Sequence, residues 1–348
     1  MDYTVRAVVP QDGPAMRQLE EMIPEPGAFS VVYRSLFDPY EVTMALHPGA
    51  LGVVAENPSG GLAGMGFVQM LRVTLDGKPY PLGRFFGIAV HPDHRRRGLA
   101  TTLYHKLFEL VRKQYGAETM FLAVIQQENE ASLRAAKTWA TQIVQGRLRY
   151  LSDRTVNRAP TPRNGLRIRP AEDRDWDMIA AGSNAFHREA EWAPNINAAS
   201  LREAHEQKPF GFSLQACFVA VDHTDSPVAG IWVTLGGLAE TGLYAKMPFR
   251  YKLMNAFSRF APSGGVLKRL TVRDLWHTPG NESAALDLWK AAAWLLRDKG
   301  NRLMAVVDPK SPLTALLPKR TFQPYEGGLL AVAASRDVNL SRILYLPF

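Results

Sequence analysis

The chain has 348 residues, about twice the length of a typical domain, so we expect two domains, each with its own hydrophobic core. Hydrophobic residues make up 46% and charged residues 21%, an ordinary globular mixture that excludes long disorder, fibrous repeats and coiled coils. With 41 Lys and Arg against 33 Asp and Glu, the formal net charge is +8, which favours an anionic partner.

Targeting segments and clustered cysteines are missing from the sequence. No window holds 18 uninterrupted apolar residues, and the start, MDYTVRAVVPQDG, lacks the basic stretch and apolar core of a secretory signal, so we expect a cytoplasmic protein outside the membrane. The single cysteine, Cys217, excludes an internal disulfide framework and a thiolate metal cluster, and we expect no metal. The basic residues are spread along the chain except at Arg95, Arg96 and Arg97, which favours one local phosphate site over a nucleic-acid surface.

The predicted elements of the first half recur in the second. Each half opens with a short strand, a polar turn and a helix. LGVVAEN at 51–57 and the strand behind it predict a hairpin, and CFVAVD at 217–222 predicts its counterpart. LGRFFGIAVHP at 82–92 likewise corresponds to LKRLTVRDLWH at 267–277, each followed by a helix and a strand. We infer a divergent duplication of one α/β unit.

A polar stretch with two prolines, SDRTVNRAPTPRN, separates the two copies and predicts a linker. We expect domains at 1–155 and 166–348 joined by residues 156–165. Directly joined strands pair antiparallel and strands separated by a helix can pair parallel, so we predict an α/β (α+β) fold with a mixed, mainly antiparallel sheet flanked by helices in each domain. The first domain is short of a strand after its second helix, and the C-terminal tail SRILYLPF is a candidate to supply it.

The most informative segment runs from residue 85 to residue 116. Phe85 to Val90 predicts a buried strand, which Pro92 ends because proline cannot donate to a sheet. Leucines spaced by four residues from Leu99 predict an amphipathic helix. The loop HRRRGLA lies between them. Since the first N–H groups of a helix have no internal partner, and a glycine lets a ligand approach them, the loop predicts a phosphate-binding site.

The same loop resembles a known signature. Arg95, Gly98 and Ala100 fit the R/Q-x-x-G-x-G/A pattern of the GNAT superfamily of acyl-coenzyme A dependent N-acyltransferases, and the strand ending VHP is similar as well. The resemblance implies that acetyl-CoA is the co-substrate, with its pyrophosphate on the loop amides and its pantetheine arm along the strand end. Asn129 stands where the family often has an asparagine that contacts the cofactor, although a helix N-cap is the equal alternative. The cofactor-binding residues that the resemblance implies are Ile88, Ala89, Val90, Arg95, Arg96, Arg97, Gly98, Leu99, Ala100, Asn129 and Ser132, with Arg96 the least central of the three arginines.

The usual catalytic side chains of the family are not found at their positions. Many GNAT enzymes have a tyrosine that protonates the leaving thiolate where this chain has Ala136, and residues 77–92 contain no Asp or Glu to deprotonate the amine. The remaining candidates are His91, Glu56 and the α-carboxylate of Phe348, because some tandem GNAT enzymes use a terminal carboxylate as base. Each has a structural alternative: a strand-end histidine, a surface glutamate and a terminal strand.

The second copy has HTPGNESAAL in place of RRRGLA, without an arginine and with Gly280 ahead of the predicted helix. We therefore expect a tandem GNAT protein whose degenerate second copy binds no coenzyme A and shapes the acceptor cleft. The predicted activity is transfer of an acetyl group from acetyl-CoA to a primary amine by direct attack. Because the acid and base are missing, the alternative is a non-enzymatic acyl-CoA-binding or sensing protein.

Overall fold

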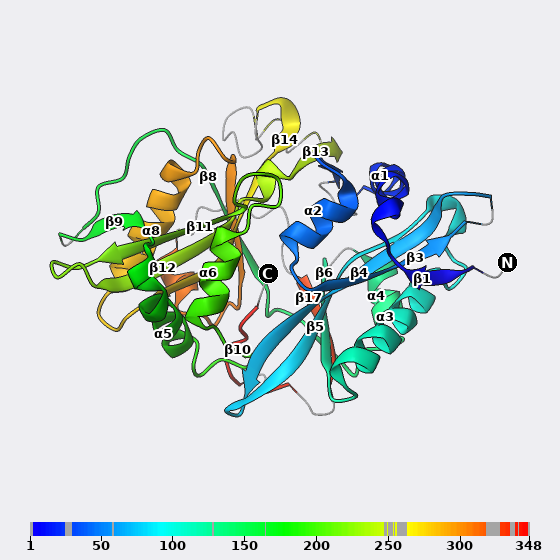
Figure 1. Cartoon of the computed structure of the whole chain (residues 1–348), viewed down its shortest axis with the longest axis horizontal. Helices are drawn as coiled ribbons and strands as arrows, with labels where there is room; N and C mark the ends of the chain where they lie inside the picture. Colours follow the sequence, from blue (N-terminus) through cyan, green and yellow to red (C-terminus); the bar gives the residue numbers. More distant parts are fainter. Residues whose placement is uncertain are drawn as a thin grey trace.

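Two large sheets, one from each half of the chain, stand side by side in the computed structural model (Figure 1). Phe348, one of the three candidate bases, lies outside the described residues. The structure describes residues 3–24, 30–57, 59–126, 129–163, 165–246, 249, 253, 255, 263–317, 328–334, 338, 339 and 341–346.

The elements of the first half are, in chain order, β1 (Val5–Ala7), η1 (Pro10–Asp12), α1 (Gly13–Met22), β2 (Ser30–Ser35), α2 (Pro39–Leu46), β3 (Ala50–Glu56), β4 (Leu62–Leu75), β5 (Lys78–Val90), η2 (Pro92–His94), α3 (Leu99–Tyr115), β6 (Met120–Gln126), α4 (Glu130–Ala136), β7 (Gln142–Val144) and β8 (Arg149–Arg154). Those of the second half are β9 (Arg167–Pro170), η3 (Asp173–Asp175), α5 (Trp176–Phe186), β10 (Ala193–Pro194), α6 (Ala198–Glu206), β11 (Gln215–Val221), β12 (Pro227–Thr234), η4 (Gly236–Leu238), β13 (Glu240–Lys246), η5 (Ser263–Gly265), β14 (Val266–Leu267), β15 (Arg269–His277), α8 (Glu282–Leu295), β16 (Arg302–Val307), α9 (Leu313–Leu316) and β17 (Gly328–Ala333).

The first sheet has the strand order β1-β3-β4-β5-β6-β17-β7, with β10 added beside β4. The second has the order β8-β16-β15-β12-β11-β9. In each sheet one pair, β5 with β6 and β15 with β16, is parallel and the other pairs are antiparallel. The predicted mixed, mainly antiparallel sheets flanked by helices are therefore confirmed.

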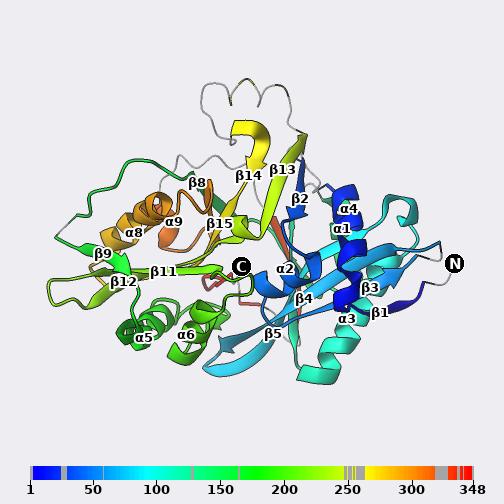
Figure 2. The same ribbon diagram turned by 45° about the horizontal axis from the view of Figure 1, so that its top comes forward.

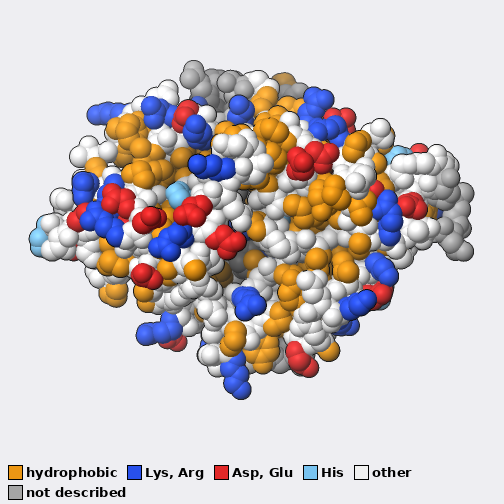
Figure 3. Space-filling view, viewed as in Figure 1, with side chains coloured by type: hydrophobic (Ala, Val, Ile, Leu, Met, Phe, Trp, Pro, Cys, Tyr) orange, Lys and Arg blue, Asp and Glu red, His pale blue; other side chains and the backbone are white. Residues whose placement is uncertain are grey.

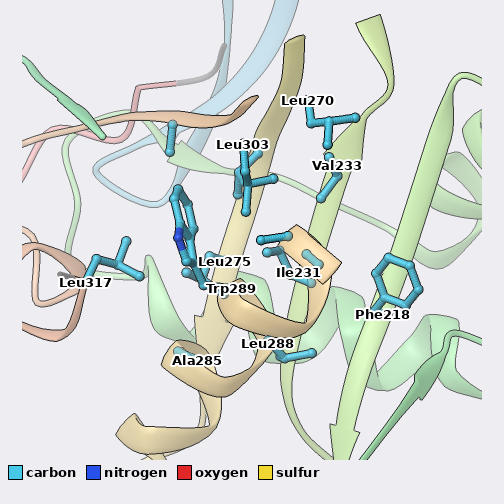
Figure 4. Close-up of a cluster of buried hydrophobic side chains, with 14 of the residues drawn as sticks. Phe218, Ile231, Val233, Leu270, Leu275, Ala285, Leu288, Trp289, Leu303 and Leu317 are labelled. Atoms are coloured by element: carbon cyan, nitrogen blue, oxygen red, sulfur yellow. The ribbon is translucent and has the colours of Figure 1, made fainter. Parts of the chain in front are cut away.

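Each sheet has helices on both faces. In the first half α3 packs on one face, where Leu103, Leu107 and Val111 are fully buried as the leucine spacing predicts, and α1 packs on the other. In the second half α8 covers one face, and α5 and α6 lie on the opposite face (Figure 2). Figure 4 shows the core under α8, where Leu288 and Trp289 meet side chains of the strands.

A repeated ion pair marks the duplication. Arg6 Nη1 donates to Asp12 Oδ2 at 2.8 Å, and Arg169 Nη2 donates to Asp175 Oδ1 at 3.0 Å. In both copies the aspartate lies six residues after the arginine, ends the first short helical turn and accepts a backbone N–H three residues before it. Two identical arrangements at the same place in the fold confirm that one unit is written twice.

The two sheets exchange strands. β8 precedes the expected linker but pairs with β16 in the second sheet, whereas β17 inserts between β6 and β7 in the first. A C-terminal strand thus completes the first sheet, but it is residues 328–333 and not the tail expected from the sequence. The domain limits of 1–155 and 166–348 stay a proposal. With these limits, β8 belongs to the first domain but pairs in the second sheet, and β17 belongs to the second domain but pairs in the first sheet.

Further contacts join the halves. β2 pairs with β13 in a third sheet of order β14-β13-β2, seen at the top of Figure 2. A hydrophobic cluster combines residues of β4, β5, β6 and β17 with Trp192 and Leu344 of the second half. Within the described part of the chain, no helix is long and apolar enough to cross a membrane.

Candidate functional site

The first sheet opens at the end of β5. β5 and β6 run parallel from Leu82 beside Met120 as far as Phe85 beside Ala123, and they pair no further. β5 continues along β4 alone, with a bulge at Gly87, where φ is +60°. In the described part of the sheet, the β6 side of Ile88–Val90 therefore has no neighbouring strand, and its backbone can pair with an extended ligand.

The loop between β5 and α3 exposes backbone N–H groups. Arg96 and Gly98 are both left-handed, with φ of +61° and +76°. The first hydrogen bond of α3 joins Thr102 N to Gly98 O at 3.1 Å, so the N–H groups of Leu99 and Ala100 have no acceptor within the helix. Alternating conformations of this kind turn successive N–H groups toward one point, and the helix dipole adds positive potential there. The loop is an anion-binding concavity.

Strand end and loop open into one groove of about 620 Å³. Ten of the eleven cofactor residues expected from the sequence line this groove, and Arg97 is the exception, because its Nη1 lies 3.5 Å from the Tyr3 hydroxyl. Arg96, expected to be the least central arginine, is on the groove. The groove is lined by Ile23, Pro24, Ile88, Ala89, Val90, His94, Arg95, Arg96, Gly98, Leu99, Ala100, Thr101, Tyr104, Asn129, Ala131, Ser132, Arg134 and Ala135.

Asn129 is the N-cap of α4, one of the two alternatives drawn from the sequence, and contact with a cofactor stays a prediction. Its Oδ1 accepts from Ser132 N at 3.0 Å, which caps α4, and the residue also faces the groove. The cap uses only the oxygen of the amide, so its nitrogen can donate to a ligand. On the opposite wall, Arg95 Nε donates to Val90 O at 3.2 Å and ties the loop to the strand end.

The side chains proposed for catalysis lie elsewhere. His91 caps η2 by accepting from Asp93 N at 3.2 Å, and Glu56 accepts from Arg6 Nε at 2.7 Å. Neither residue lines the groove. Among the described residues there is also no group of three or more His, Cys, Asp or Glu that could hold a metal ion.

Two titratable residues in the groove were not found from the sequence. Tyr104 is 4% exposed, its ring lies 5.0 Å from that of Phe85, and burial raises the pKa of its hydroxyl. His94 accepts or donates a hydrogen bond at 2.9 Å with the Tyr3 hydroxyl. A signal existed for Tyr104, because it follows Ala100 of the signature by four residues and so shares its face of α3.

Glu20 on α1 has a pKa near neutrality. Burial, followed by the nearby carboxylate of Glu240, raises the pKa of Glu20 to about 7, while the Ser35 hydroxyl donates to it at 3.4 Å. Glu20 precedes Ile23 and Pro24, which line the groove, by three and four residues. Glu20 itself does not line the groove. Its neighbours are Ser35 of β2 and Glu240 of β13, and its raised pKa leaves both protonation states populated near neutral pH.

Residues 16–138, which contain both walls of the groove, match the acetyltransferase (GNAT) family. They form a GNAT-family domain. The signature loop and α4 both lie within the matched range, so the resemblance drawn from the sequence is confirmed at the level of the family. No curated protein matches the chain significantly.

Solved structures resemble the chain over nearly its whole length. An N-myristoyltransferase from Saccharomyces cerevisiae with bound myristoyl-CoA is 12% identical, has a TM-score of 0.64, and covers 97% of this chain and 80% of its own. A tandem GNAT protein from the clavulanic acid biosynthesis pathway is 14% identical, with a TM-score of 0.57 and coverage of 97% and 100%. A GCN5-related N-acetyltransferase from Sphaerobacter thermophilus is 16% identical, with a TM-score of 0.57 and coverage of 98% of each chain. These likenesses establish a tandem GNAT fold.

The second GNAT-like copy fills its own equivalent site. Gly280 N, at the start of α8, donates to Glu282 Oε1 at 3.1 Å, so a carboxylate of the chain takes a place where the first copy leaves amides open. β15 and β16 also separate, after Thr271 beside Met304. The tail Ile343–Leu346 lines the small cavity there, and Leu344 N donates to Asp308 Oδ2 at 2.7 Å. The second copy is thus a degenerate GNAT unit.

Proposed function

We propose that the chain is an N-acyltransferase that moves an acetyl group from acetyl-CoA to a primary amine. The observation that carries the proposal is the single groove in which the open end of β5 meets the anion-binding loop of α3. Such a groove matches a ligand with an extended arm at one end and a diphosphate at the other. A cytoplasmic location is part of the proposal.

In this proposal, the pyrophosphate of acetyl-CoA accepts hydrogen bonds from the N–H groups of Gly98, Leu99 and Ala100, assisted by the Arg95 and Arg96 side chains. The pantetheine arm lies along Ile88–Val90 and pairs with the strand edge that β6 leaves open. The amide nitrogen of Asn129 faces it from α4. The backbone groups among them belong to β5 and the start of α3 and are held in place without the ligand.

The chemistry is nucleophilic attack of the amine nitrogen on the thioester carbonyl. The carbonyl oxygen becomes an oxyanion, which backbone N–H groups beside the Gly87 bulge stabilise. The carbon–sulfur bond then breaks, and coenzyme A leaves as a thiolate. We assign Tyr104 as the donor of a proton to this thiolate and Glu20 as the acceptor of the proton that the amine loses, since the pKa of Glu20 is about 7.

The side chains before the bulge favour a short acyl group. The rings of Phe67 and Phe86 stack with centroids 5.5 Å apart, and the His47 ring lies 4.1 Å from that of Phe86. The guanidinium of Arg84, 8% exposed, lies over the same Phe86 ring. A long alkyl chain extended in this direction would have to displace three packed rings and lie against a buried cation, whereas an acetyl group needs neither.

The alternative, an acyl-CoA sensor without turnover, is favoured by the position of His91 and Glu56 away from the groove. Nucleic-acid binding has less support, because Lys and Arg side chains on the face in Figure 3 are interspersed with Asp and Glu and do not form one stripe.

Thiol release tests the proposal. The protein is mixed with acetyl-CoA and a panel of small amines, amino acids, aminoglycosides and peptides, and free coenzyme A is titrated with a thiol reagent. We expect amine-dependent release above the rate of hydrolysis for at least one amine class. Tight acetyl-CoA binding without release across the panel would favour the sensor, and the absence of binding would refute both.

A further inference from the structure

A second cavity lies between the halves, away from the acyl-CoA groove. It has a volume of about 200 Å³ and is bounded by the second sheet, α5, α6, the end of β4 and residues next to β10 (Figure 1). It has no lining residue in common with the groove of the GNAT domain. The cavity is therefore a site distinct from the acyl-CoA groove.

Arg273 is the central polar residue of this cavity. Trp232 pairs with Asp274 and Val233 with Val272, so Arg273 is the extra residue of a β-bulge in β15. Its side chain is half-buried, burial lowers its pKa, and it lines both the cavity and a smaller neighbouring one. No ion pair or hydrogen bond to its side chain was found among the described residues. Among the described residues no carboxylate neutralises this guanidinium, so an anionic ligand would stabilise it.

The groups around Arg273 leave an excess of positive charge. Asp274, its neighbour in the strand, is engaged with His187 Nε2 at 2.9 Å. Tyr345 is buried, and burial raises the pKa of its hydroxyl, which therefore stays neutral. Arg84 is close enough that Arg273 lowers its pKa, after the larger effect of burial. Arg72 adds a further cation at the exposed rim. An anion entering here would be attracted.

A second polar atom in the cavity wall lacks a partner. Ser183 on α5 is 1% exposed and lines the cavity, and its hydroxyl makes no hydrogen bond. Buried hydroxyl groups are almost always hydrogen-bonded in folded proteins, so this one also points to a missing ligand. The remaining wall is mostly apolar. It includes Ile179, Leu201, Cys217, Ile231, Trp232 and Trp276, while Asn195 and the His187-bound Asp274 are further polar residues of the lining.

We propose that this cavity binds a small organic acid with an apolar or aromatic body, its carboxylate on Arg273 and Ser183 and its body against the two tryptophans. Guanidinium and hydroxyl donors suit a carboxylate, and apolar walls suit a ring or a branched chain. The size agrees, because an apolar cavity of about 150 Å³ is enough for benzene.

Calorimetric titration tests the chemistry of the ligand. The probes are benzoate, phenylacetate and 3-methylbutanoate, with phenylacetamide as the neutral isostere of phenylacetate and 2-phenylethylamine as its cationic counterpart. We expect at least one of the acids to bind, with the amide at least about tenfold weaker and the amine weaker still. Equal affinity for phenylacetate and phenylacetamide, or no binding of any acid at millimolar concentration, would overturn the proposal.

Variants test the residues. Arg273→Met keeps the length of the side chain and removes the charge, and it should weaken the acid about tenfold to a hundredfold. It should also leave Tm unchanged or raise it, since a half-buried charge without a carboxylate partner is gone. Arg273→Lys should retain most of the affinity, and Arg188→Met, at an exposed arginine, should change neither quantity. Unchanged affinity for the acid in Arg273→Met would show that Arg273 does not bind it. If Tm also fell in both Arg273→Met and Arg273→Lys, the role of Arg273 would be structural.

The acid can be a free ligand or the acid end of the acceptor amine. Phenylalanine and leucine carry both a carboxylate and an amine. In the thiol-release assay they therefore distinguish an acid that is a free ligand from an acid that is part of the acceptor. Release that disappears in Arg273→Met would make the acid part of the acceptor. Binding of the acids without release would make the cavity a separate ligand site. Both outcomes support the cavity as a carboxylate site, whereas release or binding indifferent to Arg273 contradicts it.

Discussion

Replacing Gly98 with valine tests the anion-binding loop directly. Gly98 has a φ of +76°, and an added Cβ would meet no atom within 4 Å, so the substitution does not clash with the protein. It forces a β-branched residue into the left-handed region, at about 1–2 kcal/mol. The side chain would project where we place the pyrophosphate. Loss of two charge-assisted hydrogen bonds at about 1.5–3 kcal/mol each predicts at least about 100-fold weaker binding of acetyl-CoA.

The second copy offers a matched control. Gly280 lies two residues before α8, whereas Gly98 directly precedes α3, but its φ is +82° and an added Cβ would again meet nothing within 4 Å. Gly280→Val should therefore carry the same backbone strain without affecting acetyl-CoA. Thermal unfolding should show a similar decrease in Tm for both variants, about 2–8 °C.

Calorimetric titration of acetyl-CoA into the two variants and the parent protein decides the matter. We expect Gly280→Val to bind within about twofold of the parent and Gly98→Val to lose binding. Parent-like affinity in Gly98→Val, or an equal loss in both variants, would refute the placement of the diphosphate on this loop.

Three further outcomes are expected. Tyr104→Phe should lower kcat at least about tenfold with KM for acetyl-CoA nearly unchanged, if its hydroxyl protonates the thiolate; steady-state thiol release measures both. Glu20→Gln should lower kcat/KM at neutral pH. Because the pKa of folded Glu20, about 7, lies above the usual 4.5, the carboxyl stabilises the fold most at low pH and loses that contribution as pH rises from 4.5 to 7. Urea unfolding should thus show Glu20→Gln gaining about 1–3 kcal/mol over the parent between pH 4.5 and pH 8, and no gain would contradict the raised pKa. Asp175→Ala should cost about 1.5–3 kcal/mol of unfolding free energy, since Arg169 loses its closest carboxylate but keeps Asp225 at 3.3 Å, and Asp12→Ala should cost less because Arg6 is more exposed.

Local sequence patterns predicted the strand, loop and helix that form the acyl-CoA groove. The strand ending at Val90, the glycine loop and the leucine stripe of α3 follow from hydrophobic spacing and proline chemistry within 30 residues. The positions of individual loop side chains did not follow. Arg96 and Arg97 are adjacent and chemically alike, and the left-handed φ of Arg96, which no residue type dictates, directs one to the groove and the other to Tyr3.

Features that depend on distant partners could not be predicted. The return of β17 to the first sheet pairs residues about 200 positions apart, for example Leu330 with Val124, and a short apolar strand gives no sign of its partner. The pKa of Glu20 depends on burial by tertiary packing and on Glu240. The repeated Arg6 and Asp12 spacing was visible in the sequence, but its meaning emerges only when both copies form the same ion pair.

The strand exchange bears on how the protein is made. A ribosome releases the chain from its N-terminus, yet the first sheet lacks β17 until residue 333 has emerged. Until then, β6 and β7 present edges with unpaired backbone groups, which invite pairing with other chains. The GNAT domain therefore cannot mature as an early folding unit during synthesis, and a gene fragment ending near residue 155 would lack β17, the strand that joins β7 to the rest of the sheet.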